Sequence, residues 1–595
     1  MPSASNPPVN NEETAQPIKR FWRSDSLLKS KLLGFLPFML LTNLSSLLIT
    51  SVDGVVVGNF VSTDALSSVN IVLPITSVLG VVSVLIASGI GTTLSTSMGE
   101  NHIEDLRYQK KVAKTLTVLS VLVLCVIEVP VAALMIRSYH LSPEMNTLVW
   151  NYTAGTLIAS PCGLISTICV FELQILGKTK VLTSLAIAEG LINLVLDLLF
   201  VGVFHWGVAG TGYGTAVANV IRCVSSVVYL SRKTDIYATG HERVREKDIL
   251  RMLRTGLSEA SYSAMLALQN YFIVSILLST FGEKFGVIDG VCRFCLSIAN
   301  VVIMSVQNSA RPLIGILTGG RDVVGVRMLI RRCIVLMAGL LGIITALVMI
   351  TPDLFYHLHH VTDIPPFGVI CLRLYTLHFI FRGINAILRL YFGNRGDVTY
   401  NSMVTVAGYA TLPLFAFILS RIDAPIFYAA YMVTECLLLA VNFLHYRAVI
   451  KKDLEKQTPD ENILYLTVTP QDALEASRSI REYAEAHGYP QRIAYRVALC
   501  MEEMVHYAEA VKNHDRVNTQ VMVRFCEDGC VFTIMDDGRC IMLNEDDASR
   551  DIVSNYSVIR KIADTVSYQY VLEMNYTVFT FEQRPSMGAP GIAAG

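Results

Sequence analysis

The feature that most constrains this chain is a series of long apolar runs separated by short polar loops. A helix needs about 20 apolar residues to cross a bilayer, and the segment from Leu32 to Ala448 contains about twelve runs of that kind. They lie near 32–58, 66–94, 112–136, 147–175, 181–204, 210–231, 256–280, 287–318, 328–350, 366–391, 399–420 and 425–448. No soluble core needs that much apolar length in series. The sequence therefore predicts an all-α polytopic membrane protein with about 12 transmembrane helices.

The composition supports this fold class and excludes others. Of the 595 residues, 52% are hydrophobic and 16% are charged, whereas soluble domains carry about 25% charged residues. The formal net charge of -1 gives no basic footprint for nucleic-acid binding. Residues 1–30 are polar and contain no apolar run, so we expect an amino-terminal tail without a cleaved signal peptide.

Lysine and arginine gather in alternate loops, which predicts the orientation of the spans. The basic loops carry Lys19, Arg20, Arg23, Lys29, Lys31, Arg107, Lys110, Lys111, Lys178, Lys180, Arg232, Lys233, Arg243, Arg245, Lys247, Arg251, Arg321, Arg327, Arg331, Arg332, Arg395, Arg447, Lys451 and Lys452. The opposite loops carry little more than Arg137, Lys284 and Arg421. We therefore expect the amino terminus, the central polar loop and everything after Arg447 to be cytoplasmic.

An internal similarity divides the membrane part into two halves, at an offset of about 220 residues. Thr96–Glu100 ends the second run and Leu317–Arg321 ends the eighth, and each is followed by a basic stretch. Repeats of this kind predict two lobes around a central cavity, with transport by rocking of one lobe on the other. We expect six-helix lobes at 31–235 and 251–450, joined by a cytoplasmic linker at 236–250.

Acidic side chains inside the first half are the main candidates for chemistry, because ionisable groups in a bilayer are costly. Asp53 lies in the first run, and Glu189, Asn193 and Asp197 lie at intervals of four residues in the fifth, which places these three on one helix face. Carboxyl groups that share a dry site can hold a proton, or bind Na⁺ together with an amide oxygen. The alternative is a structural polar cluster that holds helices together.

These motifs resemble the multidrug and toxic compound extrusion (MATE) family. The similarity rests on Val52-Asp53-Gly54, on Pro74, on Ile192-Asn193 through Asp197 with Trp206–Gly210 and Gly214-Thr215 after it, and on Arg311–Gly315. The resemblance implies export of organic solutes in exchange for H⁺ or Na⁺. It also implies a cation site at Asp53, Asn193 and Asp197, with no other cofactor required.

The second half departs from that family pattern. Some members carry a buried acid in the seventh span, where this chain has the amides Gln269 and Asn270. Basic groups stand out instead: Asp289 and Arg293 form an i, i+4 pair, and one helix stripe carries His378, Arg382, Asn385 and Arg389. We hypothesise that these side chains line a substrate cavity that favours an anionic group, since Arg binds carboxylates bidentately. The alternative is pairing between helices or snorkelling at span ends.

The composition changes abruptly after Lys452, which predicts a soluble domain at 455–585 and a short tail at 586–595. The patterns indicate strands near 463–468, 519–526, 530–535, 566–572 and 576–582, and helices near 471–487, 490–512 and 551–564. This order predicts an α+β domain with helices on one face of a mixed sheet.

The tail resembles the GHKL-type ATP-binding domain of anti-sigma-factor kinases. The similarity rests on Ala498–Glu503, Met535–Gly538 and Ile559–Asp564, and it implies nucleotide-site roles for Glu503, Asp536 and Gly538. The Mg²⁺-binding Asn of that family is replaced by Tyr507, and the lid segment 551–557 has no glycine. Backbone N–H groups approach a phosphate less easily without glycine. We therefore expect a degenerate regulatory or docking module, with ATP binding left open and no kinase or ATPase activity.

Taken together, the sequence predicts a cation-coupled exporter in a bacterial inner membrane, not an enzyme, with a cytoplasmic regulatory domain that a cytoplasmic protein could bind. Two other classes stay open: a lipid-linked oligosaccharide flippase of the same superfamily, and a membrane sensor that no longer transports.

Overall fold

A computed structural model describes residues 26–100, 103–233, 243–282, 284–358, 364, 367–460, 462–511, 518–526, 529–538 and 562–582. These residues divide into two compact units. The membrane unit is Leu28–Leu454, and the soluble unit consists of the described residues of Glu455–Tyr570 and Met574–Gly595. The division falls beside the predicted boundary at 455, and each unit is described by itself.

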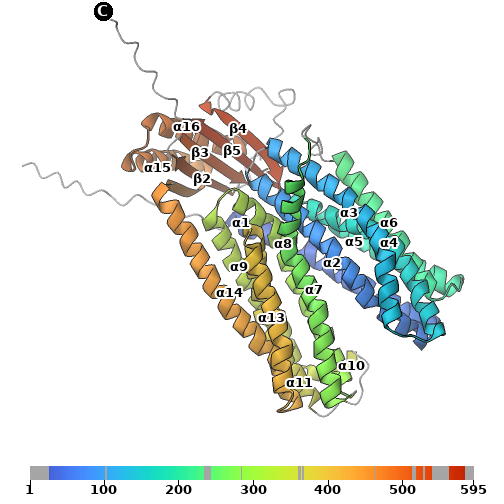
Figure 1. Ribbon diagram of the computed structural model, residues 1–595. Helices are drawn as coiled ribbons and strands as arrows, with labels where there is room; N and C mark the ends of the chain where they lie inside the picture. Colours follow the sequence, from blue (N-terminus) through green and yellow to red (C-terminus); the bar gives the residue numbers. More distant parts are fainter. Residues whose placement is uncertain are drawn as a thin grey trace, which may run out of the picture. The chain divides into compact units, whose positions relative to one another are not determined.

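Long helices make up the membrane unit (Figure 1). In the amino-terminal half they are α1 (Ser26–Phe60), α2 (Thr63–Glu100), α3 (Ile103–Ser138), α4 (Pro143–Ile175), α5 (Thr179–Asp197), the π-helix η1 (Leu198–Val203) and α6 (Val208–Lys233). In the carboxy-terminal half they are α7 (Glu246–Phe281), α8 (Lys284–Gly319), α9 (Val323–Ile350), α10 (Pro352–Leu358), α11 (Gly368–Thr376), α12 (His378–Arg395), α13 (Val398–Leu419) and α14 (Ala424–Asp460).

Eleven of the described helices are long and apolar enough to cross a membrane, which confirms a polytopic membrane protein. The run predicted at 366–391 differs from the others because it forms two helices, α11 and α12, that meet at Leu377. α12 has only 18 residues and carries three arginines. The exact number of 12 spans and the division into two six-helix lobes stay predictions.

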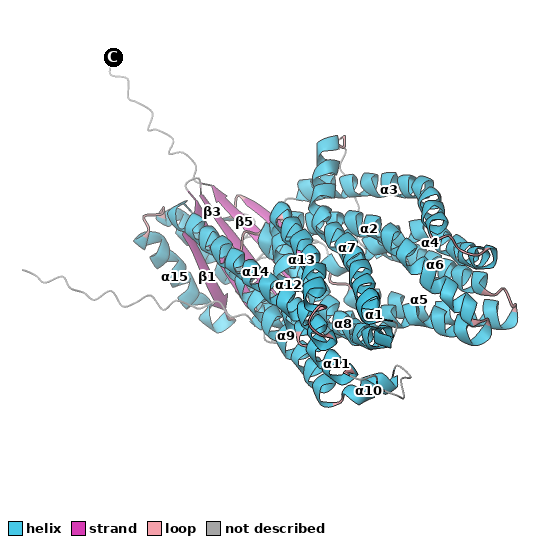
Figure 2. Ribbon diagram, turned by 60° about the horizontal axis from the view of Figure 1, so that its bottom comes forward, coloured by secondary structure: helices cyan, strands magenta, loops and turns pink. Residues whose placement is uncertain are grey.

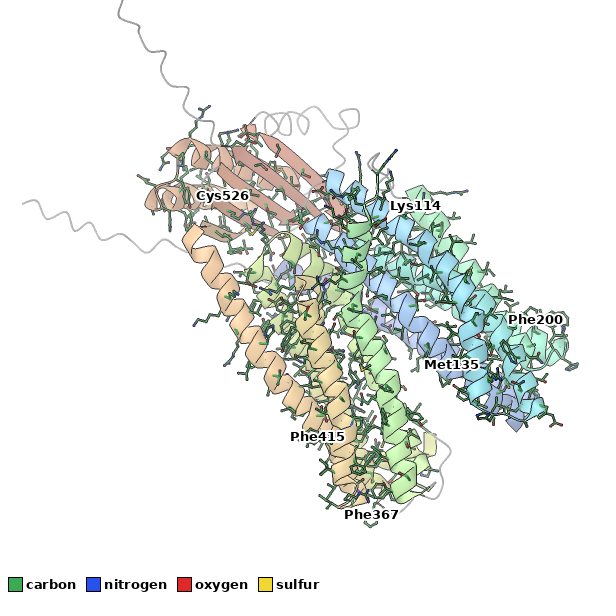
Figure 3. All side chains as sticks on the ribbon, in the orientation of Figure 1. Lys114, Met135, Phe200, Phe367, Phe415 and Cys526 are labelled. Atoms are coloured by element: carbon green, nitrogen blue, oxygen red, sulfur yellow. The ribbon has the colours of Figure 1, made fainter. Side chains whose placement is uncertain are left out.

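The outer surfaces of the membrane helices are apolar, as expected where lipid is the solvent. On α3, Leu122 is 61% exposed and Val126 and Leu134 are each 72% exposed. Figure 3 shows side chains such as Met135, Phe200 and Phe415 distributed along these helices. Burial of apolar surface from water therefore does little to hold the helices together, and close packing must do more.

Glycine pairs provide that close packing at two helix crossings. A Cβ built on Gly212 of α6 would lie 2.8 Å from the carbonyl oxygen of Tyr152 on α4, beside Gly155. A Cβ built on Gly99 of α2 would lie 2.9 Å from the Cα of Gly319 on α8. The second crossing joins the two segments that the internal similarity equates, the end of the second run and the end of the eighth.

The soluble unit is a five-stranded sheet with two helices, α15 (Ala473–Ala486) and α16 (Gln491–Val511), packed against it (Figure 2). The strands are β1 (Asn462–Val468), β2 (Thr519–Cys526), β3 (Gly529–Asp536), β4 (Thr565–Val571) and β5 (Met574–Glu582), in the order β1-β2-β3-β5-β4. A short 3₁₀ turn, η3 (Pro470–Asp472), precedes α15. The predicted strands and the first two predicted helices are confirmed, and the helix predicted near 551–564 lies largely outside the described residues.

The predicted mixed sheet is wrong, because the sheet is antiparallel. β1–β2, β2–β3 and β3–β5 pair antiparallel, and β4 returns to β5 through the two-residue turn Leu572-Glu573, both at positive φ. The prediction of a mixed sheet came from the order of strands and helices, which does not determine which strands become neighbours. In the structure β5 lies between β3 and β4, so no parallel contact forms there.

Candidate functional site

The carboxyl group of Asp53, on α1, is buried among α4 and α6. Its exposed fraction is 6%, and its Oδ2 accepts hydrogen bonds from Tyr152 Oη at 2.9 Å and Thr215 Oγ1 at 3.2 Å. Asn193 Nδ2, on α5, donates to the same Thr215 hydroxyl at 3.0 Å. One hydroxyl of α6 therefore links the predicted residues of the first and fifth runs.

Asp197 completes the group as the last residue of α5. It is fully buried, it is close enough to Asp53 for the two carboxyl groups to interact directly, and the π-helix η1 begins at the next residue. Such π-turns inside helices occur frequently at functional sites. Gly214 of α6 makes room for this carboxyl group, because a Cβ there would lie 2.5 Å from Asp197 Oδ1.

Several oxygen atoms of this group of residues have no hydrogen-bond partner. Four buried oxygens have no hydrogen-bond partner, namely Asp53 Oδ1, Asn193 Oδ1 and both carboxylate oxygens of Asp197. Among the residues that the structure describes, no basic side chain pairs with either acid. Two adjacent carboxylates without a cation repel each other, and carboxylate and amide oxygens are suited to a hard cation. The arrangement can therefore hold a proton or Na⁺.

Glu189, the other predicted acid of α5, has a different role in the structure. It is 8% exposed and forms an ion pair with Arg222 of α6. The pair neutralises both side chains inside the amino-terminal half. Sequence reasoning placed Glu189 on the right helix face but did not identify Arg222 as its partner.

A cavity that is partly open to the surroundings lies within the carboxy-terminal half, among α7, α8, α12, α13 and α14. Four of the predicted cavity residues line it: Gln269, Arg382, Asn385 and Arg389. Sequence reasoning missed Tyr262, Tyr409, Tyr431, Glu435 and Asn442, which also line it. Glu435 is an acid within an apolar run, and that signal alone would have marked it as a candidate.

Polar contacts in this cavity centre on Glu435. Its Oε2 accepts a 2.8 Å hydrogen bond from Asn385 Nδ2, and its Oε1 lies 3.7 Å from Arg382 Nη1. Asn442 Nδ2 in turn donates to Asn385 Oδ1 at 3.1 Å. Asn385 therefore holds the carboxylate more closely than Arg382 does.

The two arginines of the stripe share one aromatic ring. Arg382 Nη2 donates to Tyr262 Oη at 3.2 Å, and the Arg389 guanidinium lies over the ring of Tyr262, 3.8 Å from its centroid. Arg382 is 9% exposed, and Arg389 is half-buried. The cation–π contact of Arg389 and the hydrogen bond of Arg382 both involve Tyr262, so both guanidinium groups lie in one region of the cavity.

The remaining residues predicted for the cavity lie elsewhere. His378 is fully buried, its Nδ1 bonds to the Tyr375 carbonyl of the preceding turn, and its ring packs on Tyr431 with centroids 5.2 Å apart. Asp289 and Arg293 pair with each other at 2.5 Å, and Arg293 Nη1 donates to Asn270 Oδ1 at 3.1 Å. These four side chains contact other protein groups, and the pair of Asp289 and Arg293 lies within α8 rather than between helices.

In the soluble unit, Asp536 ends β3 and is 1% exposed. Its Oδ1 accepts hydrogen bonds from the Gly538 amide at 2.8 Å and from Asn575 Nδ2 at 2.7 Å. Glu503 lies half-buried on α16. The predicted lid lies outside the described residues, so nucleotide binding through Glu503, Asp536 and Gly538 stays a prediction.

Part of the membrane unit is similar in sequence to known proteins. Residues 39–199 match the MatE family model. The multidrug export protein MepA of Staphylococcus haemolyticus is 20% identical over 296 residues, 49% of this chain and 65% of the relative. The chain thus matches slightly less than two thirds of that relative's length.

Solved structures share the fold. A MATE in a straight conformation superposes with a TM-score of 0.67 at 15% identity, covering 72% of this chain and 97% of that one. A MOP superfamily transporter from Pyrococcus furiosus, described as having a binding pocket of reverse polarity that suggests a different function, gives a TM-score of 0.63 at 16% identity, covering 71% and 96%. The membrane unit therefore has the MATE fold.

Proposed function

We propose that this protein is a cation-coupled exporter of organic solutes, in which Asp53 and Asp197 bind the coupling ion. The observation that supports this most strongly is the set of unpartnered buried oxygens around these two acids. An ion that neutralises the carboxyl groups removes their repulsion and fills an otherwise costly polar space. The free energy of ion binding then differs between the conformation that opens to one face of the membrane and the conformation that opens to the other.

Asn193 and Tyr152 complete the proposed ion site. The Asn193 side-chain oxygen supplies a neutral ligand if the ion is Na⁺, and its amide fixes the Thr215 hydroxyl that also contacts Asp53. Tyr152 donates to the same Asp53 oxygen, Oδ2, as Thr215 does, which leaves Asp53 Oδ1 for the ion. Glu189 is not part of the proposed set, because Arg222 neutralises it.

The soluble unit is proposed as a cytoplasmic regulatory or docking module in a bacterial inner-membrane protein whose two termini face the cytoplasm. Calorimetric titration of the full-length protein with ATP and Mg²⁺ tests whether the soluble unit lacks ATP hydrolysis, as a degenerate module would. We expect no turnover, and tight Mg²⁺-dependent binding with hydrolysis would contradict the proposal.

Ion flux in proteoliposomes tests the transport proposal. An imposed H⁺ or Na⁺ gradient should drive uptake of an organic dye into proteoliposomes, and dye movement should in turn move the ion. Movement of lipid-linked oligosaccharide without ion flux would favour a flippase instead. Absence of any flux by a folded protein would favour a sensor.

A further inference from the structure

We propose that the cavity of the carboxy-terminal half is a binding site for an organic anion that carries one carboxylate on an aromatic body, with Arg389 and Arg382 as its anchors. This inference names a substrate class for the proposed exporter. It rests on the proposed function only where it treats the bound anion as a transported substrate. Binding itself requires no ion gradient.

The charge of the cavity wall supports a monoanion. Its ionised lining residues are Arg382, Arg389 and Glu435, so two positive charges face one negative charge. The next acid near Arg389 is Glu259, whose Oε1 already pairs with Arg311 Nη2 at 3.4 Å. One positive charge is left without a counterion among these groups. A buried charge without a partner is costly, and one added carboxylate would remove that cost.

The geometry leaves the guanidinium groups available to a ligand. Glu435 is held by Asn385 at 2.8 Å and lies 3.7 Å from Arg382, which is too long for a good charge-assisted hydrogen bond. Arg389 contacts the face of Tyr262, which leaves the edge of its guanidinium group without a carboxylate. An incoming carboxylate can bind such an edge bidentately, a geometry that Lys cannot reproduce.

The rest of the wall indicates the body of the ligand. Tyr262 and Tyr409 meet edge to face with ring centroids 5.5 Å apart, and Tyr431, Leu412 and Leu438 line the same space. Aromatic and aliphatic walls with a few convergent polar groups are typical of small-molecule sites. A flat apolar body attached to the carboxylate fits this surface.

Equilibrium binding to purified full-length protein in nanodiscs tests the proposal with three matched probes. The probes are 2-naphthoate, the neutral 2-naphthamide and the cationic 2-naphthylmethylammonium. The wild-type protein should bind naphthoate at least about tenfold more tightly than either other probe, since one charged hydrogen-bonded contact is worth a factor of that order. Equal binding of all three probes, or preference for the cation, would overturn the proposal.

Variants separate the anchors from general effects of charge. Arg389→Gln should weaken naphthoate binding about tenfold and leave naphthamide unchanged, and Arg389→Lys should restore only part of the loss. Glu435→Gln should strengthen naphthoate binding, because it removes a competing carboxylate. Arg373→Gln, at an exposed position on α11 outside the cavity, is the control and should change nothing.

Two results would defeat the assignment even if transport were intact: unchanged naphthoate binding in Arg389→Gln, or weaker binding in Glu435→Gln. Thermal unfolding of each variant identifies any that fails to fold, and Arg389 is preferred to the more buried Arg382 for that reason. The binding assay imposes no ion gradient, so a protein that does not couple ion movement to transport can still show the predicted preference for naphthoate. Failure of the ion-coupling proposal is therefore distinguishable from failure of this one.

Discussion

Tyr152 of α4 donates a 2.9 Å hydrogen bond to the carboxylate of Asp53 on α1. The two residues are 99 positions apart in the sequence, and the contact places a neutral donor beside an acid that has no basic partner among the described residues. The Tyr152 hydroxyl and any bound ion would therefore contact the same Asp53 carboxylate.

Removing that hydroxyl should change ion affinity without unfolding the protein. In Tyr152→Phe the carboxylate loses a donor that stabilises its free form, so the coupling ion should bind about tenfold more tightly, as expected for one charge-assisted hydrogen bond. Ion-concentration dependence of dye transport in proteoliposomes measures this. An unchanged half-saturating ion concentration would show that the hydroxyl has no part in the site.

The pair of Glu189 and Arg222 should behave as a structural unit. Glu189→Gln leaves the buried Arg222 without its counterion, which should lower stability by about 3 kcal/mol. The double variant Glu189→Gln with Arg222→Gln should recover much of that loss. Thermal unfolding of the purified proteins measures both effects. A stable Glu189→Gln variant that loses ion coupling would restore Glu189 to the ion site.

The crossing of α4 and α6 should not tolerate a methyl group. Gly212→Ala would place a Cβ 2.8 Å from the Tyr152 carbonyl oxygen, and the resulting backbone shift should destabilise the protein by about 1–3 kcal/mol. Gly339→Ala on α9 is the matched control, because nothing lies within 4 Å of its Cβ. Equal melting temperatures for the two variants would contradict the packing described here.

The thiol of Cys500 should be unreactive in the folded soluble unit. It is fully buried on α16, and burial raises its pKa to about 12. The thiolate is the reactive form, so only about one thiol in ten thousand is ionised at pH 8 by that value. Reactivity is therefore low at neutral pH, and it rises about tenfold with each pH unit below pH 12 because the thiolate fraction does so.

Mass spectrometry after treatment with N-ethylmaleimide tests this at pH 7 and pH 9. Modification of Cys500 should be slow at both values and become fast in denaturant. The half-buried Cys526 on β2 provides an internal comparison within the same unit. Rapid native labelling of Cys500 at pH 7 would show that α16 is less well packed than the structure indicates.

Apolar run length predicted most of the membrane unit, because a lipid-spanning helix has few alternatives once every backbone group must be bonded internally. The same rule failed to predict the break at Leu377, which depends on packing around α11 and α12. Spacing on one helix placed Asn193 and Asp197 together. It gave no information about Tyr152 or Arg222, because contacts between helices are set by the fold and not by the local period.

For the cavity too, the local sequence pattern predicted some residues, and contacts between helices determined the others. The stripe from His378 to Arg389 was visible in the sequence, and three of its four members line the cavity. His378 belongs to the same stripe but lies one turn beyond, where Tyr375 and Tyr431 enclose it. In the soluble unit, the alternation of apolar and polar residues predicted where the strands lie. It did not predict the strand order, in which β5 lies between β3 and β4.

The most direct test of the account is coupled ion movement by Asp53→Asn in proteoliposomes, compared with Glu128→Gln. Glu128 of α3 is also a 6% exposed acid in the amino-terminal half, but it lies outside the proposed ion site. We predict that both variants fold and insert, that Glu128→Gln exchanges dye for H⁺ or Na⁺ as the wild type does, and that Asp53→Asn loses this exchange by at least about a hundredfold, about 2.7 kcal/mol. Full ion-coupled exchange by Asp53→Asn would contradict the central claim.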